Sequence, residues 1–222
     1  MGETNWSLYN YHQFVPGEPD FKQLRVGIED GRQWIPSEVN VSIRPGWFYH
    51  KYEDAKVKKL PQLLDIYYNS IGRNGTWLLN FPIDKEGRIH ENDERAVLEL
   101  RKALDEAFAD NLARKAKAEA GNVRGGSSRY AASKAIDGKK DTYWATDDGV
   151  TQTYITLTFR KPVTLNRILL QEYIRLGQRV KAFKVEANVD GQWRELAKET
   201  TIGYYLLYTS PSPRDRTRSR MP

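Results

Sequence analysis

The clearest regular pattern of apolar and polar positions lies in residues 38–43. Apolar side chains occupy every second position there: Val39, Val41 and Ile43. A period of two residues is typical of a β-strand with one buried face. Pro45-Gly46 then turns the chain, and we expect the aromatic run at 47–50 to form a second short strand or strand end.

A helix, a strand and a second helix are predicted after this segment. Apolar residues recur at helical spacing over residues 60–71. Residues 76–81 are a short apolar stretch bounded by Gly and Pro, which is typical of a buried parallel strand. A second helix is expected from about Asn92. Its apolar stripe is Val97, Leu100, Leu104, Phe108 and Leu112.

Strands that alternate with helices indicate βα units. About three strands are too few to close a barrel. The family resemblance described below implies that the first half is the C-terminal portion of a (β/α)8 TIM-type barrel. The composition changes between Arg114 and Ser128, where Gly and Ser become frequent, as at a domain boundary. Short strands and an Asp190-Gly191 hairpin turn are then expected. They predict an incomplete antiparallel β-sandwich (jelly roll). The predicted domains are residues 1–117 and 118–205.

Residues 206–222 form a separate tail in this interpretation. The sequence LLYTSPSPRD followed by SRMP resembles the translation of a sequencing-library adapter. We therefore expect the tail to be non-native and to pack against neither domain. The β-sandwich would then be cut short near Tyr205.

Composition and charge narrow the function classes. The chain has 222 residues, a net charge of +6 and no cysteine, so it has no disulfides and no thiolate metal site. Half of the positive excess lies in residues 206–222, and elsewhere basic and acidic residues are interspersed, which argues against nucleic-acid binding. No apolar run approaches the ~18 residues of a transmembrane helix. The first residues lack the basic region and apolar core of a signal peptide. If the chain is truncated at that end, a signal peptide would have been lost with the missing part.

The candidate chemistry lies around the first predicted strand. Two aromatic clusters, at Trp34 and Trp47, bracket one carboxylate, Glu38, and one imidazole, His50. Sugar rings stack their C–H faces on aromatic side chains and bond their hydroxyls to carboxylates and imidazoles. The alternative is an ordinary core strand with a solvated Glu. Asn80, near the end of the next strand, would face the same site or instead bond the backbone of the following loop.

Three segments carry a resemblance to a known family: WIPSEVNVSIRPGWFYH at 34–50, LPQLL at 60–64 and NGTWLLNFP at 74–82. They resemble the α-L-fucosidase glycoside hydrolases, in the branch that prefers fucose on branched oligosaccharides, over roughly residues 1–115. Trp77 departs from the smaller aliphatic residue that is usual in this family. The resemblance implies partners that are fucosylated oligosaccharides or glycoproteins, no cofactor for catalysis, and a periplasmic or secreted parent protein.

The same resemblance implies a retaining mechanism with Glu38 as general acid/base, assisted by substrate-binding residues Trp34, Trp47, His50 and Asn80. The nucleophile of this family is an Asp on an earlier barrel strand. Only 37 residues precede Glu38, so we expect the nucleophile to lie upstream of this chain and the chain as given to be inactive.

A second resemblance covers about residues 122–205. The run Ala135-Ile136-Asp137-Gly138, followed by Asp141-Thr142-Tyr143-Trp144, resembles the discoidin-like, galactose-binding jelly rolls. It implies a structural Ca²⁺ held by Asp137 and Thr142, since a hard cation prefers oxygen ligands. The alternative is a turn fixed by Asp side-chain hydrogen bonds and anchored by Trp144.

Two functions follow from the sequence. The first is a retaining α-L-fucosidase that removes terminal fucose from glycans, of which this chain is a fragment. The second is a non-catalytic carbohydrate-binding fragment. An upstream strand that bears an Asp nucleophile would favour the first. A structural β-sandwich adaptor is a third alternative, and it would have no use for Glu38 or His50.

Overall fold

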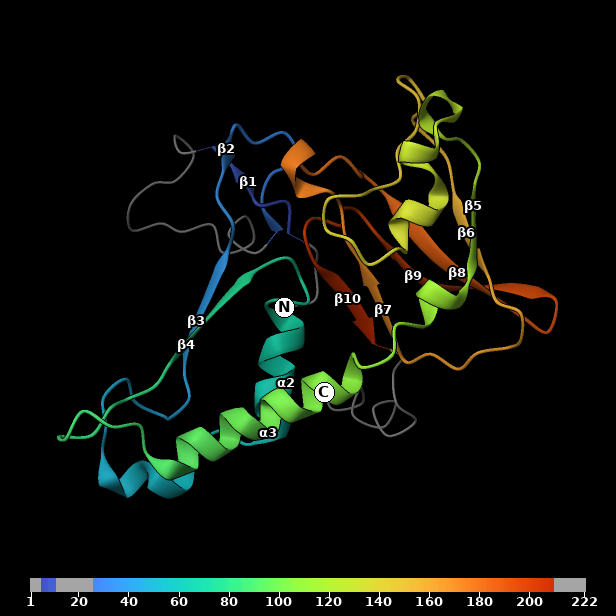
Figure 1. The fold of residues 1–222 in the computed structure, drawn as a ribbon. Coiled ribbons are helices and arrows are strands. Elements are labelled where there is room, and N and C mark those ends of the chain that lie inside the picture. Colours follow the sequence, from blue (N-terminus) through green and yellow to red (C-terminus); the bar gives the residue numbers. More distant parts are fainter. Residues whose placement is uncertain (1–4, 11–25, 210–222) are drawn as a thin grey trace, which may run out of the picture. The chain divides into compact units, whose positions relative to one another are not determined.

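The computed structural model describes residues 5–10 and 26–209 (Figure 1). The chain forms two compact units. The first contains the described residues up to Glu106 together with those from Arg167 onward, and the second is Ala107–Asn166. The predicted boundary between residues 117 and 118 falls within strand β5 (Lys117–Ala120) of the second unit.

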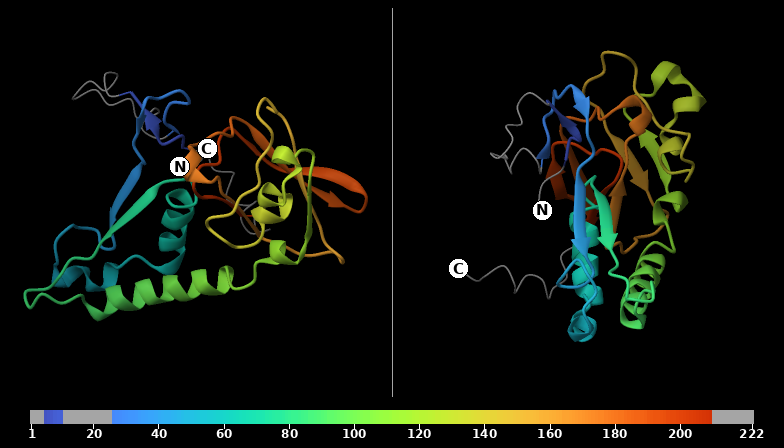
Figure 2. Two further views of the ribbon diagram at one scale, coloured as in Figure 1. Left: turned by 45° about the horizontal axis from the view of Figure 1, so that its top comes forward. Right: turned by 90° about the vertical axis from the view of Figure 1, so that its left-hand side faces the viewer.

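A parallel βαβ element is the centre of the first unit. Strand β3 (Glu38–Ser42) and strand β4 (Thr76–Asn80) pair in parallel, from Glu38 opposite Thr76 to Ser42 opposite Asn80. Helix α2 (Leu60–Asn69) connects the two strands, and Figure 2 shows β3 and β4 side by side. Parallel neighbours require such a crossover connection, so the predicted βα unit is confirmed.

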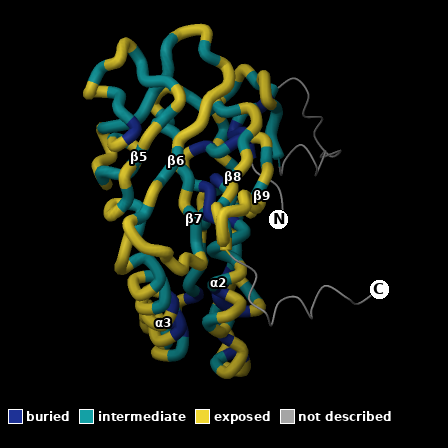
Figure 3. Tube along the Cα trace, turned by 90° about the vertical axis from the view of Figure 1, so that its right-hand side faces the viewer, coloured by how far each residue is buried: buried dark blue, intermediate teal, exposed yellow. Residues whose placement is uncertain are grey.

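The apolar core of this unit lies between the strands, α2 and helix α3 (Glu91–Ala107). Its buried members are Ile43, Val57, Leu63, Ala96 and Leu100. Figure 3 shows buried positions on both helices, whereas much of α3 is exposed. Leu100 and Leu104 of the predicted apolar stripe belong to this core, whereas Val97 is only half-buried and is not one of the core residues. The helix ends at Ala107, so Phe108 and Leu112 lie beyond it, and Leu112 begins a short 3₁₀ helix, η3 (Leu112–Lys115).

The aromatic run at 47–50 does not form a strand, and that prediction is wrong. Residues 43–50 form a loop that leads into the 3₁₀ helix η2 (Lys51–Lys56). β propensity reflects packing on a pleated sheet surface, and the carboxyl end of β3 offers this run no partner strand among the described residues.

One buried cation joins three elements of the first unit. The Arg44 side chain is fully buried, and its Nε donates to both carboxylate oxygens of Asp93 in α3, at 3.1 and 2.9 Å. Its Nη1 donates to Asp54 Oδ1 in η2 at 2.8 Å. Because a buried charge is costly unless it is paired, Arg44 fixes how the end of β3 meets η2 and α3.

Antiparallel pairs make up the remaining strands of the first unit. Strand β1 (Leu8–Tyr9) pairs with β2 (Gln33–Trp34). Strands β8 (Phe183–Val189) and β9 (Gln192–Glu199) form a hairpin. Asp190 and Gly191 both have positive φ at its turn, as the predicted Asp-Gly turn requires. A short 3₁₀ helix, η7 (Ile174–Leu176), precedes this hairpin.

The last described strand corrects the expectation for the tail. Strand β10 (Leu206–Thr209) pairs antiparallel with β7 (Arg167–Leu170), and Leu206 and Leu207 are buried. The expectation that residues from 206 onward make no packed contacts is therefore wrong for 206–209. An open strand edge offers unpaired N–H and C=O groups to an extended segment, and residues 206–209 occupy that edge of β7. Residues 210–222 lie outside the described residues, and the adapter resemblance stays a prediction.

The second unit contains one antiparallel pair and several short helical turns. Strand β5 pairs with β6 (Ile155–Thr158). The 3₁₀ helices between them are η4 (Arg124–Gly126), η5 (Ser128–Tyr130) and η6 (Ala132–Ala135). The short strands predicted for the second half of the chain are present, and they pair antiparallel in twos. A complete two-sheet sandwich stays a prediction. No helix in the described part of the chain is long and apolar enough to cross a membrane.

We predict that Asp93→Ala destabilises the first unit by about 3–5 kcal/mol, because it leaves the buried Arg44 guanidinium without its main partner. Asp105→Ala is the matched control. Asp105 lies on the same helix and pairs with Arg101 at 2.7 Å, but both side chains are exposed, and such a pair contributes about 0.3–0.5 kcal/mol. Urea unfolding of the two variants measures the difference. Equal losses would show that the Arg44–Asp93 pair contributes no more than a surface ion pair.

Candidate functional site

The carboxyl ends of β3 and β4 are joined by polar side chains. Asn80 donates from Nδ2 to the Trp47 carbonyl at 3.0 Å and to Ser42 Oγ at 3.2 Å. Ser42 Oγ in turn donates to the Gly46 carbonyl at 2.7 Å. Because Ser42 and Asn80 stand opposite each other in the parallel pair, the two strands together position the loop that carries Trp47. Asn80 was expected either to face the candidate site or to bond the backbone of the following loop. It lies at the carboxyl end of β4, and its amide bonds the backbone of the loop that carries Trp47.

Exposed aromatic side chains gather in this loop and in η2. Trp47 is 50% exposed, Phe48 79% and Tyr52 69%. The His50 ring stacks on Tyr52, with ring centres 5.2 Å apart and planes 19° apart. Large exposed apolar side chains close together indicate a binding surface. The sequence prediction missed Phe48 and Tyr52, although the aromatic run itself was the signal that could have identified them.

A cluster of charged and aromatic side chains packs against the loop that carries Trp47. The Tyr49 ring faces the Arg44 guanidinium at 4.8 Å, and His90 Nε2 lies 3.4 Å from Asp54 Oδ2. The hydrogen bond from Arg44 lowers the pKa of Asp54 below its ordinary value. Desolvation raises the pKa of Tyr49. Asp54 therefore stays ionised at neutral pH and serves as an acceptor, not as a proton donor.

Glu38 lies at the opposite end of the sheet from the Trp47 loop. It is the first residue of β3, stands opposite Thr76 at the amino end of the pair, and is exposed. Its side chain makes no hydrogen bond or ion pair with any described residue. Glu38 therefore does not lie with Trp47 at the carboxyl ends of the strands, and its role as general acid/base stays a prediction. Alternation fixes the face of a strand on which a side chain lies, but not the end.

Trp34 belongs to a different element from the Trp47 loop. It lies in β2, pairs with Leu8 of β1, and is about half exposed. The structure therefore brings Trp47, His50 and Asn80 to one end of the βα unit. It does not bring Glu38 to them.

The second unit contains the two residues expected to hold calcium. Thr142 Oγ1 lies 2.8 Å from each carboxylate oxygen of Asp137, and the Lys139 backbone N–H donates to Oδ1 at 2.9 Å. The bond from Lys139, followed by that from Thr142, lowers the pKa of Asp137. Trp144 Nε1 donates to the Asn122 carbonyl at 2.9 Å. The carboxylate is thus satisfied by donors of its own turn, and this favours the turn over the metal site.

Within the described part of the chain, no group of three or more His, Cys, Asp or Glu side chains could hold a metal ion. Calcium at Asp137 and Thr142 remains a prediction.

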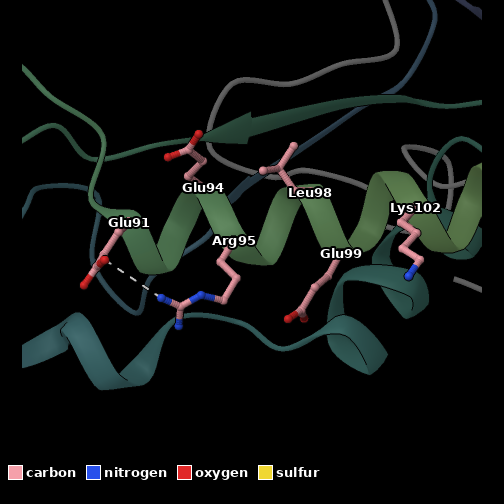
Figure 4. Close-up of a pocket in the computed structure, with 6 residues that line it drawn as sticks. All are labelled: Glu91, Glu94, Arg95, Leu98, Glu99 and Lys102. Atoms are coloured by element: carbon pink, nitrogen blue, oxygen red, sulfur yellow. Dashed lines mark ion pairs between the residues drawn. The ribbon is translucent and has the colours of Figure 1, made fainter.

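Two surface recesses in the first unit are lined by residues outside the 43–50 loop. The first follows the outward face of α3, and all six residues that line it belong to that helix (Figure 4). They are Glu91, Glu94, Arg95, Leu98, Glu99 and Lys102. The second lies between η2 and α3 and includes Asp54 and Lys59. The first is an ordinary charged helix surface with Leu98 exposed, and it offers no convergent chemistry.

Comparison with known proteins points to one enzyme class. Residues 116–212 match the family model of the F5/8 type C domain, in line with the galactose-binding-like domain predicted here. The chain is 37% identical over 205 residues to Alpha-L-fucosidase 1 of Arabidopsis thaliana, covering 91% of this chain and 40% of that protein. It is also 37% identical over 212 residues to Putative alpha-L-fucosidase 1 of Oryza sativa subsp. japonica, covering 95% of this chain and 41% of that protein.

Solved structures give the same result. A putative α-L-fucosidase from Bacteroides thetaiotaomicron superposes with a TM-score of 0.88 at 37% identity, covering 94% of this chain and 46% of that one. A GH29 fucosidase from Ruminococcus gnavus, solved in complex with fucose, superposes with a TM-score of 0.79 at 35% identity, covering 83% of this chain and 37% of that one. The chain is thus similar to α-L-fucosidases along nearly all of its length, but it spans about two-fifths of the length of the curated relatives.

We predict that Asn80→Ala loosens the loop at 43–50. It removes the hydrogen bond to the Trp47 carbonyl and the bond to Ser42 Oγ, which in turn holds the Gly46 carbonyl. Each such bond contributes on the order of 1 kcal/mol, so amide exchange in this loop should accelerate about 5- to 30-fold. Hydrogen-exchange mass spectrometry of the peptides that cover the loop measures this. Asn69→Ala is the control, since the Asn69 amide bonds Asp65 within α2. Unchanged exchange at 43–50 in Asn80→Ala would refute the role of Asn80.

Proposed function

We propose that this chain is part of a retaining α-L-fucosidase, a glycoside hydrolase that removes terminal α-L-fucose from oligosaccharides or glycoproteins. Similarity to α-L-fucosidases along nearly the whole chain carries the proposal. The exposed aromatic loop at the carboxyl ends of β3 and β4 is consistent with it, because barrel enzymes place their active sites at that end of the strands.

In this proposal β3, α2, β4 and α3 are the C-terminal portion of a (β/α)8 barrel. The parallel register of β3 and β4 supports the assignment, as does the packing of both helices on one core. Trp47 would offer an aromatic face to the sugar, and His50 would bond a substrate hydroxyl. Asn80 would hold the Trp47 loop in place and would reach the substrate only through it.

The proposed mechanism is a double displacement. One carboxylate attacks the anomeric carbon and forms a glycosyl ester, while a second carboxylic acid protonates the departing glycosidic oxygen. The second group then removes a proton from water, which attacks the anomeric carbon and releases fucose with retained configuration. We assign the second role to Glu38. The resemblance supports this assignment, whereas the position of Glu38 at the amino end of β3 does not.

A second candidate function is sugar binding without chemistry. The match to the F5/8 type C domain and the exposed Trp47, Phe48 and Tyr52 favour it. Calorimetric titration with fucose separates the two functions: binding by a chain that never hydrolyses fucosides, even when completed to full barrel length, would favour the second.

We predict that the purified 222-residue chain does not hydrolyse an aryl α-L-fucoside. The described residues contain one pair of parallel strands, whereas the barrel that would hold the carboxylate pair about 5–5.5 Å apart needs eight. Release of the aryl alcohol, followed by absorbance, is the measurement. Sustained turnover would show that both catalytic carboxylates lie within these 222 residues.

A chimera tests the role of Glu38, with this chain in place of the matched region of the Bacteroides thetaiotaomicron relative. Glu38→Ala should slow hydrolysis of fucosides with poor leaving groups about 10²- to 10⁴-fold, because these must be protonated. An activated aryl fucoside should be affected much less, and azide should rescue the variant. His50→Ala is the control and should weaken binding of both substrates alike. Equal losses on both substrates for Glu38→Ala, without azide rescue, would place the acid/base elsewhere.

A further inference from the structure

Several polar side chains of the first unit meet at a buried junction. Its members come from four segments that are apart in the sequence: Asn5 and Ser7, Asn74, Gln178, and Thr201. Four of them, all except Gln178, are at most 9% exposed. Gln178 Nε2 donates to the Asn5 carbonyl at 2.8 Å and to Thr201 Oγ1 at 3.2 Å. We call these five residues the polar junction.

Asn74 is the centre of the polar junction. It has a positive φ of 64°, which few non-glycine residues adopt. Its Nδ2 donates to the Asn5 carbonyl at 2.8 Å and to Ser7 Oγ at 3.2 Å. Its Oδ1 accepts from the Tyr204 backbone N–H at 2.8 Å, and its own N–H donates to the Tyr205 carbonyl at 2.9 Å. One residue thus bonds the N-terminal segment and the region matched by the F5/8 type C domain.

Gly203 allows this close approach. A Cβ at position 203 would overlap the Asn74 side-chain amide, and Gly203 has a φ of +71°. Glu172 holds the glycine in place: its Oε2 accepts from the Gly203 N–H at 2.7 Å. Its Oε1 accepts from the N–H groups of Arg179 and Val180 at 2.6 and 2.8 Å.

The contact continues along the backbone and side chains beside the polar junction. The Leu207 N–H donates to the Gly72 carbonyl at 2.9 Å, and Arg73 and Leu206 form a β-bridge. The hydroxyls of Tyr67 and Tyr205 lie 3.1 Å apart. Arg167 Nε donates to the Tyr68 hydroxyl at 2.7 Å. Burial raises the pKa of Tyr205, so its hydroxyl stays protonated and able to donate.

We propose that the turn at residues 70–75 is a docking site for segment 201–208, and that this segment anchors the βα unit. The region that resembles a carbohydrate-binding module would then have a structural task, and its partner would be the α2–β4 turn of the same chain. The anchor lies at the amino end of β4, whereas Asn80 and the Trp47 loop lie at the carboxyl end. It therefore contributes stability without occupying the candidate site, and it does not depend on the proposed enzymatic function.

Two properties distinguish this contact from an ordinary association of domains. Interfaces between domains of one chain are commonly solvated enough to permit relative motion. Here Asn5, Ser7 and Thr201 are 0–2% exposed, and buried polar groups that lose their partners are costly. Backbone hydrogen bonds also cross from Gly72 and Asn74 to the 205–207 segment. Separation would leave these groups unpaired, so we expect α2, β4 and the 201–208 segment to unfold together.

Gly203→Ala tests the proposal in the whole chain, with Gly191→Ala as the matched control. Both glycines have positive φ, but a Cβ at Gly191 meets open space, so the control carries the backbone strain without the clash with Asn74. Gly203→Ala should lower Tm about 5–10 °C more than Gly191→Ala does. It should also accelerate amide exchange in α2 (60–69) and β4 (76–80), which the control should leave unchanged. Acceleration confined to residues 167–209 would overturn the proposal.

Tyr67→Phe provides a milder second test if Gly203→Ala does not fold. It removes one hydroxyl from the Tyr67–Tyr205 contact and leaves the backbone unchanged. Amide exchange should accelerate about 3- to 10-fold on both sides of the contact, in 60–69 and in 203–208. Tyr52→Phe, on an exposed ring, should change neither. A response in α2 alone would show that the two segments open independently, and the anchor would be refuted.

Discussion

The burial of the Arg44 guanidinium is the constraint on which the first unit depends. A cation that is removed from water must be compensated by nearby anions and acceptors, and here these come from two further elements, η2 and α3. Asp93 supplies two oxygens from the first turn of α3, and Asp54 supplies one from η2. The position of α3 relative to β3 is therefore fixed by charge as well as by the apolar contacts of Leu100 and Ile43. Arg44 belongs to the loop at 43–50 that carries Trp47, so the same ion pairs also position this loop.

Asparagine side chains secure the two ends of β4. At the carboxyl end, Asn80 bonds the backbone of the Trp47 loop and the hydroxyl of Ser42. At the amino end, Asn74 bonds the N-terminal segment and the segment around Tyr204. An amide side chain carries donors and an acceptor on one rigid plane, so each residue satisfies several backbone groups at once. One end of the strand thereby presents exposed aromatic rings, and the other end is a buried contact between distant parts of the chain.

If β3 and β4 belong to a (β/α)8 barrel, as proposed, this division would correspond to the organisation of barrel enzymes, in which the carboxyl ends of the strands carry the chemistry and the amino ends carry stability. The similarity to α-L-fucosidases fits it, with one exception. Glu38, which the resemblance identifies as the acid/base, begins β3 at the end that carries stability. The segment just before it, residues 35–37, connects β2 to β3.

The sequence by itself determined the local elements. A period of two predicted β3, helical spacing predicted α2 and most of α3, and Asp190-Gly191 predicted the β8–β9 hairpin, because each signal involves residues that are neighbours along the chain. Only the tertiary structure decided the rest. The 47–50 run is a loop because no described strand pairs with it, and the Trp47 carbonyl instead accepts from Asn80, 33 residues away. Glu38 and Trp47 were expected to share a site because they are close in sequence. However, Glu38 begins the five-residue strand β3 and Trp47 follows its other end, so the length of the strand separates them. Leu206 and Leu207 are buried because β7 and the 72–73 backbone, more than 30 residues away, pair with them. Such long-range hydrogen bonds leave no periodic trace in the sequence.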